Sequence, residues 1–285
     1  MASTPVNTSS VKVSGTVTNY RGPLFLLISL FFMWGFITCL NDILIPHLKV
    51  LFVLDYTRTM LIQLTFFGAY AMVSMPAGFV IGRIGYKNGI VLGLIVTAIG
   101  ALVFLPASVL VNYYVFLSGL FILASGIAIL QVAANPYVAN IGPAESASGR
   151  LNLAQAFNSF GTTIAPVMGG WFIFSAVGDS VVEQAKTVQL PYIGIAITLL
   201  LIAIIFLVIK LPKIQNEDLV STASGSAWRY RHLVLGAIAI FVYVGTEVSI
   251  GSFLINFFEL PEIGSMSAKT ATAFVSLYWG GAMIG

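Results

Sequence analysis

The sequence predicts an all-α membrane protein built from consecutive apolar helices. Of the 285 residues, 58% are hydrophobic and 8% are charged, and the mean hydropathy is +0.98. Soluble domains carry about 25% charged residues, so this chain has too few charges to cover a surface exposed to water. Uncharged runs recur along the chain, and several exceed the roughly 20 helical residues that cross a hydrocarbon core of about 30 Å. Composition and run length together exclude a soluble domain.

Eight membrane-spanning helices are predicted from these runs. They lie near residues 24–46, 58–82, 89–109, 113–139, 151–175, 190–210, 232–258 and 269–285. The uncharged run 88–144 is too long for one span, and it is divided at Pro106 to Asn112, a short turn-forming stretch. The eighth span reaches Gly285 without a cap, a charged flank or a tail. We therefore expect seven complete spans and a sequence that stops inside a helix.

The basic residues set the predicted orientation, because short loops rich in Lys and Arg stay on the cytoplasmic side of a membrane. With a cytoplasmic N-terminus, most of the 13 Lys and Arg residues fall on that side. These are Lys12, Arg21, Arg83, Lys87, Arg150, Lys210, Lys213, Arg229 and Arg231. The others, Lys49, Arg58, Lys186 and Lys269, fall outside. We expect a multi-pass protein of the inner (cytoplasmic) membrane, whose net charge of +3 indicates no nucleic-acid partner.

One polar segment divides the chain into two membrane parts. Residues 211–231 combine charge, Ser, Gly and Pro, and they follow six predicted spans. We expect a cytoplasmic tail at 1–23, a six-helix bundle at 24–210, a cytoplasmic linker at 211–231 and the incomplete start of a second bundle at 232–285. Six spans, a linker and a new start are typical of transporters whose two halves are related by an internal repeat.

Two carboxylates stand inside predicted spans, Asp42 in the first and Glu247 in the seventh. A charge at the centre of a membrane helix costs roughly 2.5–3.5 kcal/mol, and such residues usually face a cavity or a partner. The alternative is that each lies near a membrane interface. Neither has a Lys or Arg at helical spacing, so each is a candidate to bind a proton or hold a cation such as sodium. Gly35 and Gly245 precede these acids at similar places in their spans, a weak echo of an internal repeat.

Uncharged polar residues recur near these acids, together with one aromatic ring. The candidates for binding a substrate are Trp34, Asn41, Gln131, Asn135, Gln155 and Asn158. Side-chain amides supply the paired donors and acceptors that sugar hydroxyls need, and an aromatic ring packs on the apolar face of a sugar. The alternative is that these amides only form hydrogen bonds between helices and hold the bundle together. Both interpretations remain open at the level of sequence.

An intramembrane enzyme is the least supported class of function. No predicted span carries a metal-binding cluster of His, Cys and Glu or a Ser-His pair. We expect no enzymatic activity and no cofactor beyond a coupling proton or sodium ion.

Several segments resemble one transporter family. The loop GFVIGRIGYKNG at 78–89 resembles the conserved loop between spans two and three of the major facilitator superfamily, although Gly82 replaces the usual acid. The segments FFMWGFITCLNDILIPHL at 31–48, LQVAANPYVANIGP at 130–143 and RLNLAQAFNSFG at 150–161 look like the fucose/glucose/galactose symporters within that superfamily. The segment FVYVGTEVSIGSFL at 241–254 is similar to the seventh span of the glucose/galactose branch.

This resemblance implies the major facilitator fold, in which two six-helix bundles work by alternating access. The chain would hold the first bundle, the linker and the first one to two helices of the second. Asp42 matches the proton-linked carboxylate of the family. Gln131 matches a position at which fucose-proton symporters carry a second acid. The resemblance therefore implies that coupling here differs from the fucose carriers and involves Glu247, with either a proton or sodium as the ion. Asn41, Gln155 and Asn158 fall on positions that resemble polar residues lining the family's cavity.

The function expected from the sequence is cation-coupled symport of a neutral hexose by a monomer in the lipid bilayer. Glucose or galactose is the first expected substrate, followed by fucose and by an N-acetylated sugar. A membrane sugar sensor or assembly subunit that does not transport is the alternative from another class. Because the transport path lies between two halves, we expect the 285-residue chain by itself to be inactive in transport.

Overall fold

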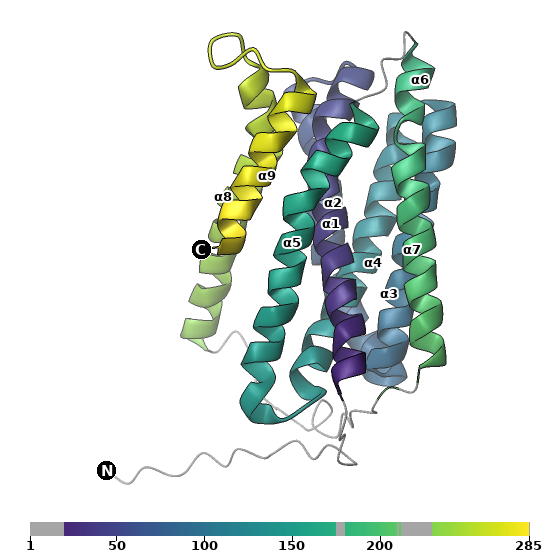
Figure 1. Ribbon diagram of the computed structural model, residues 1–285, viewed down its shortest axis with the longest axis vertical. Helices are drawn as coiled ribbons and strands as arrows, with labels where there is room; N and C mark the ends of the chain where they lie inside the picture. The colour runs from purple at the N-terminus through teal and green to yellow at the C-terminus, as the bar shows by residue number, and fades with distance from the viewer. Residues whose placement is uncertain (1–19, 175–179, 210, 212–229, 285) are drawn as a thin grey trace.

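The computed structural model describes residues 20–174, 180–209, 211 and 230–284, which form long helices running roughly along one axis (Figure 1). The long helices are α1 (Arg21–Leu51), α2 (Tyr56–Ile84), α3 (Tyr86–Leu110), α4 (Tyr113–Asn140), α5 (Ala147–Ile173), α7 (Gln189–Val208), α8 (Arg231–Glu259) and α9 (Ala268–Ile284). A 3-10 turn, η1 (Ala144–Ser146), precedes α5, and the short α6 (Val181–Lys186) precedes α7. We call the end at which α1 begins the lower end, as drawn in Figure 1, and the opposite end the upper end.

Each predicted span coincides with one long helix, so the all-α prediction is confirmed. Among the described residues, six segments have the length and composition of a membrane span, namely α1, α2, α3, α4, the combined α6 and α7, and α8. The predicted fifth span, α5, is not among these segments, because polar residues in its first half lower its mean hydropathy. The predicted eighth span, α9, has 17 residues. The predicted tail (1–23) and linker (211–231) lie almost wholly outside the described residues.

The break between α3 and α4 lies within the stretch from Pro106 to Asn112, where the sequence predicted it. Pro106 stays inside α3, and the helix ends at Val111, whose φ of 45° lies in the left-handed region. Asn112 then caps α4, because its side chain accepts hydrogen bonds from the backbone N–H groups of Tyr114 and Val115. The cap satisfies two N–H groups that have no partner within the helix.

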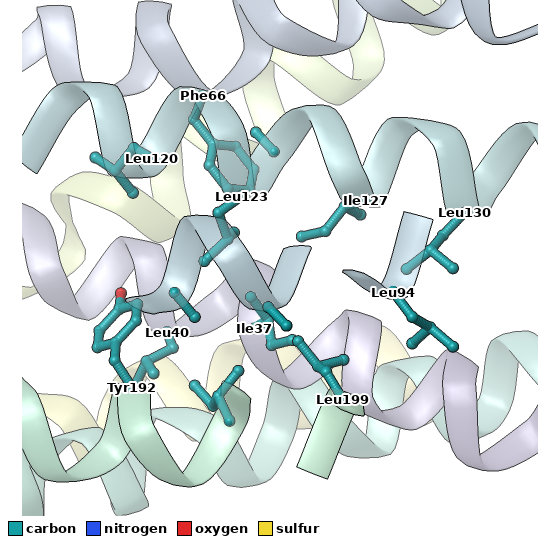
Figure 2. Close-up of a cluster of buried hydrophobic side chains, with 14 of the residues drawn as sticks. Ile37, Leu40, Phe66, Leu94, Leu120, Leu123, Ile127, Leu130, Tyr192 and Leu199 are labelled. Atoms are coloured by element: carbon teal, nitrogen blue, oxygen red, sulfur yellow. The ribbon is translucent and has the colours of Figure 1, made fainter. Parts of the chain in front are cut away.

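The apolar core joins α1, α2, α3, α4 and α7. Figure 2 shows side chains from these five helices meeting in one cluster, with Phe66 of α2, Leu123 of α4 and Tyr192 of α7 among them. The Tyr192 ring stacks on Phe104 of α3 with the ring centres 3.9 Å apart. Since lipid tails are as apolar as these side chains, close packing holds this cluster together more than exclusion of water does.

Glycines bring some helices into closer contact than side chains would permit. At Gly126 of α4, an added Cβ would lie 2.3 Å from the backbone nitrogen of Thr97 on α3. The pair Gly78 and Gly82 on α2 has the spacing typical of helix contacts. Yet a Cβ at either position would meet no atom of the described residues within 4 Å. Spacing alone therefore does not identify the glycines that pack.

Basic residues at the lower end close the C-termini of helices. The Arg150 side chain, only 4% exposed, donates to the carbonyls of Val138 and Ala139 in the last turn of α4 at 3.0 and 2.6 Å. Lys87 donates to the carbonyls of Leu207 and Ile209 at the end of α7 at 3.0 and 2.8 Å. The last carbonyls of a helix lack partners and carry a partial negative charge, so cations stabilise them.

The helices α8 and α9 contact the other helices mainly near the upper end. The buried residues of α8 are Gly251, Ser252 and Ile255, and those of α9 are Ala271, Thr272 and Val275. Thr272 lies against Gly170 of α5, where an added Cβ would come within 2.6 Å of its hydroxyl oxygen. The lower half of α8, residues 231–246, is largely exposed, and in Figure 1 it lies apart from α5. The two parts of the chain therefore meet at one end.

We expect Gly126→Ala to lower the free energy of unfolding by about 1–3 kcal/mol, because the new methyl group overpacks the contact between α3 and α4. Gly82→Ala is the matched control. It should leave stability unchanged or raise it by up to about 1 kcal/mol, since Ala is the better helix former. Unfolding by SDS in mixed micelles, followed by circular dichroism, measures both. Equal stability of the two variants would contradict the close contact.

Arg150→Ala should lower the free energy of unfolding by about 2 kcal/mol or more, because buried carbonyls of α4 lose a charged donor. The exposed Arg83 on the same end is the control, and Arg83→Ala should change stability by less than about 0.5 kcal/mol. The same SDS titration compares the two. A similarly small change in stability at both sites would contradict the proposed stabilisation of the end of α4 by hydrogen bonds from Arg150.

Candidate functional site

Asp42 is the central residue of a polar cluster that joins three helices. It lies on α1 and is 6% exposed. Its Oδ1 atom accepts a hydrogen bond of 2.8 Å from the hydroxyl of Ser252 on α8 and one of 3.0 Å from the Nε2 group of Gln63 on α2. The Gln63 Nε2 group also donates to the Ser252 hydroxyl oxygen. The buried carboxylate thus receives donors from both parts of the chain.

Asn41 extends this arrangement by one residue. Its Nδ2 group donates to the Oε1 atom of Gln63 at 3.3 Å, and its side chain is 2% exposed. Its Oδ1 atom is buried and has no hydrogen-bond partner within the described parts of the chain. Buried polar atoms are usually paired, so this oxygen has room for a donor or a cation. We call Asn41, Asp42, Gln63 and Ser252 the Asp42 cluster.

The local sequence supplies one more oxygen at this place. Pro46 lies inside α1, four residues after Asp42. Proline has no amide hydrogen, so the backbone carbonyl of Asp42 lacks its α-helical partner. A carboxylate, a backbone carbonyl and the amide oxygen of Asn41 therefore come from two adjacent residues. Oxygen ligands of this kind suit hard cations.

Glu247, the second predicted acid, lies apart from the Asp42 cluster. It is half-buried on α8, and its backbone carbonyl accepts a 3.0 Å hydrogen bond from the hydroxyl of Tyr278 on α9. Its carboxylate interacts with Tyr243 one turn earlier. The Tyr278 hydroxyl interacts electrostatically with both Asp42 and Glu247. Within the described residues, no hydrogen bond joins the Glu247 carboxylate to the Asp42 cluster.

Asn158 and Trp34, two of the predicted substrate-binding residues, both contact neighbouring side chains or helices. The Nδ2 group of Asn158 on α5 donates to the backbone carbonyl of Phe31 on α1 at 3.0 Å. This bond holds two helices together, which was the alternative interpretation of the polar residues. The half-buried Trp34 ring lies 5.3 Å from the Phe31 ring and beside Tyr70 of α2.

The remaining predicted amides keep accessible side chains. Gln131 and Asn135 are half-buried on α4, and Gln155 is exposed on α5. Within the described parts of the chain, none of these three side chains has a hydrogen-bond partner. They are not brought into the Asp42 cluster, and they stay candidates for contact with a ligand.

Two members of the Asp42 cluster, Gln63 and Ser252, were not predicted from the sequence. Gln63 is a lone amide in an uncharged run and carried no spacing signal. Ser252 lies 210 residues after Asp42, the offset that also separates Gly35 from Gly245. The echo of a repeat therefore pairs Asp42 with Ser252 rather than with Glu247. Following this offset further along the sequence would have found Ser252.

Comparison with known proteins gives one consistent family. The sequence profile of the Major Facilitator Superfamily matches residues 25–285. The glucose/galactose transporter of Brucella abortus biovar 1 (strain 9-941) is 54% identical over 286 residues, covering 99% of this chain and 69% of that protein. The L-fucose-proton symporter of Escherichia coli (strain K12) is 36% identical over 303 residues, covering 97% of this chain and 69% of that protein.

A solved structure shows the same arrangement of helices. The crystal structure of FucP, a Major Facilitator Superfamily transporter in the outward conformation, matches with a TM-score of 0.72 at 37% identity. The match covers 93% of this chain and 68% of that one. Profile, relatives and fold agree, and the resemblance of the sequence motifs is confirmed. The chain belongs to the Major Facilitator Superfamily, in the family of the glucose/galactose transporters and L-fucose-proton symporters.

Proposed function

We propose that this protein takes part in cation-coupled symport of a neutral hexose by alternating access, with glucose or galactose as the first expected substrate. Fucose and an N-acetylated sugar follow in that order. The observation that carries the proposal is the buried carboxylate of Asp42, placed at the contact between α1, α2 and α8 in a chain 54% identical to a glucose/galactose transporter. A site between two halves is where transporters of this kind bind substrate and coupling ion.

Asp42 is the proposed coupling residue. A proton would bind its carboxylate directly. A sodium ion would add the Asp42 carbonyl and the unpaired Oδ1 atom of Asn41. Glu247 is the proposed second charge, and the Tyr278 hydroxyl donates to its backbone carbonyl. Both ions are candidates for coupling in this protein. The relative from Escherichia coli is named as a symporter of L-fucose and protons, which indicates proton coupling in that relative.

The proposed sugar contacts come from side chains that the helices leave accessible. Gln131, Asn135 and Gln155 have amides with unused donors and acceptors, which suit hydroxyl groups. Asn158 uses its nitrogen on α1 and keeps its oxygen for a sugar hydroxyl. Trp34 offers an aromatic face for the ring.

The proposed setting is an inner membrane with the lower end on the cytoplasmic side, and the proposed state is a monomer. The described basic residues support this orientation. Arg21, Arg83, Lys87, Arg150 and Arg231 all lie at the lower end. Short basic segments are retained on the cytoplasmic side. The proposed domain boundaries are unchanged, with bundles at 24–210 and 232–285 and a linker at 211–231.

Asp42→Asn should remove the dependence of hexose binding on the coupling cation, because the amide keeps the shape of the side chain but loses its charge. We expect the affinity for labelled glucose or galactose to fall by about tenfold or more under the cation condition that favours binding. Equilibrium binding in lipid nanodiscs, with sodium varied at fixed pH and pH varied at fixed sodium, measures this and distinguishes the two ions.

Asp55→Asn is the control for this change. Asp55 is exposed and caps α2, and Asn caps helices about as well as Asp. Its hexose affinity and cation dependence should match the unmodified protein. A cation dependence that survives Asp42→Asn would refute the coupling role of Asp42, and an unmodified protein that binds no hexose would refute the proposed function.

Asn158→Ala and Gln155→Ala should separate helix packing from ligand contact on α5. Asn158→Ala loses the hydrogen bond to α1, so the free energy of unfolding should fall by about 0.5–1.5 kcal/mol. Gln155→Ala removes an exposed amide, so stability should stay within about 0.5 kcal/mol while hexose affinity falls severalfold. SDS unfolding and the binding assay are run on both. A Gln155→Ala variant with unchanged affinity would remove Gln155 from the substrate site.

A further inference from the structure

The contact between α1 and α8 lies near the upper end and includes a hydrogen bond between the two helices. Asp42 and Ser252 are hydrogen-bonded at 2.8 Å. About two turns farther along both helices, Lys49 of α1 and Glu259 of α8 interact only weakly and form no salt bridge within the described residues. About two turns in the opposite direction, an added Cβ at Gly245 would meet no described atom within 4 Å. The helices therefore touch at the level of Asp42 and above it, and they separate below.

The numbers of donors and acceptors make the Asp42 carboxylate the acceptor on which the contact between α1 and α8 depends. A hydroxyl has one hydrogen, and Ser252 gives it to Asp42. Gln63 has two hydrogens on its amide nitrogen, and it directs donors to Asp42 and to Ser252. Its oxygen accepts from Asn41. Every donor of Gln63 and Ser252 is thus engaged, and both residues share the same oxygen of Asp42.

Sharing this oxygen creates a competition. A cation that approaches Oδ1 of Asp42 needs the lone pairs that Ser252 and Gln63 use. Gln63 belongs to α2, which stays packed on α4. Ser252 belongs to α8, which has only three buried residues, so its hydroxyl is the donor that moves most readily. Occupation of Asp42 would therefore weaken the attachment of α8 to α1.

We propose that Ser252, positioned together with Gln63, is the latch that holds the upper ends of α1 and α8 closed while Asp42 is unoccupied. The inference rests on the proposed function, because it takes Asp42 as the carboxylate that binds the coupling cation. Ser252 and Gln63 are then positioning residues that connect occupation of Asp42 to opening of the upper end. A hydrogen bond with a purely structural role would stabilise the fold without controlling the distance between the upper ends of α1 and α8.

The experiment measures the distance between the upper ends of the two helices. Val50 near the end of α1 and Glu262 after α8 are exposed, and both are replaced by Cys in a Cys39→Ala background. Spin labels at these positions report the distance distribution by pulsed electron resonance in lipid nanodiscs. The parent protein should show mainly the short distance, because the Ser252 hydroxyl of α8 donates to Asp42 of α1.

Ser252→Ala should shift the ratio of long to short distances by about tenfold, because a hydrogen bond to a charged acceptor is lost. Ser252→Thr keeps the hydroxyl and should restore the parent distribution. Gln63→Leu should shift it in the same direction. Ser249→Ala is the matched control, since Ser249 is exposed and donates at 2.6 Å to Gly245 of its own helix. It should behave as the parent.

An unchanged distance distribution in both folded Ser252→Ala and folded Gln63→Leu would overturn the proposal. So would an equal shift in Ser249→Ala, because the effect would then not depend on Asp42. Hexose binding is measured on the same parent sample. A parent that shows the expected distances but binds no hexose would refute the proposed function and leave the latch between α1 and α8 standing as a mechanical contact.

Discussion

The buried carboxylate of Asp42 is the interaction on which the arrangement of this protein depends. A charge inside apolar helices is costly unless it has partners, and here the partners come from α2 and α8. Because an unpaired Asp42 would be costly in free energy, its pairing with Ser252 stabilises the contact of α8 with the first bundle. Few apolar side chains of α8 are buried, so this polar contact has an influence on α8 that it would lack inside a large hydrophobic interface.

The first bundle is held by different means, which explains why it can serve as a frame for the cluster. Glycine contacts between α3 and α4 and aromatic stacking between α3 and α7 pack the helices closely. The buried Arg150 and the half-buried Lys87 close the lower ends of α4 and α7 by donating to backbone carbonyls. Residues expected from the sequence only to orient the chain in the membrane therefore also terminate helices.

Prediction from sequence succeeded where the signal was local and failed where it depended on which side chains meet. Runs without charge located every long helix, because the length needed to cross a bilayer is fixed by helix geometry. The break after α3 was also located, since Val111 adopts a left-handed conformation at the end of α3 and Asn112 caps α4. Asp42 and Asn41 were identified as unusual polar residues, whereas Gln63 and Ser252 appeared ordinary until the fold placed them beside Asp42.

The sequence by itself determined that this protein belongs in a membrane, where its described long helices lie, and that Asp42 is an unusual charge within them. Composition and spacing suffice for these because each depends on one helix and its surroundings. Only the tertiary structure decided that Asn158 bonds to α1, that Glu247 lies apart from Asp42, and that Ser252 is the partner of Asp42 across 210 residues. Such pairings depend on how helices pack, and helix packing is set by many contacts at once, so no single position in the sequence reveals it.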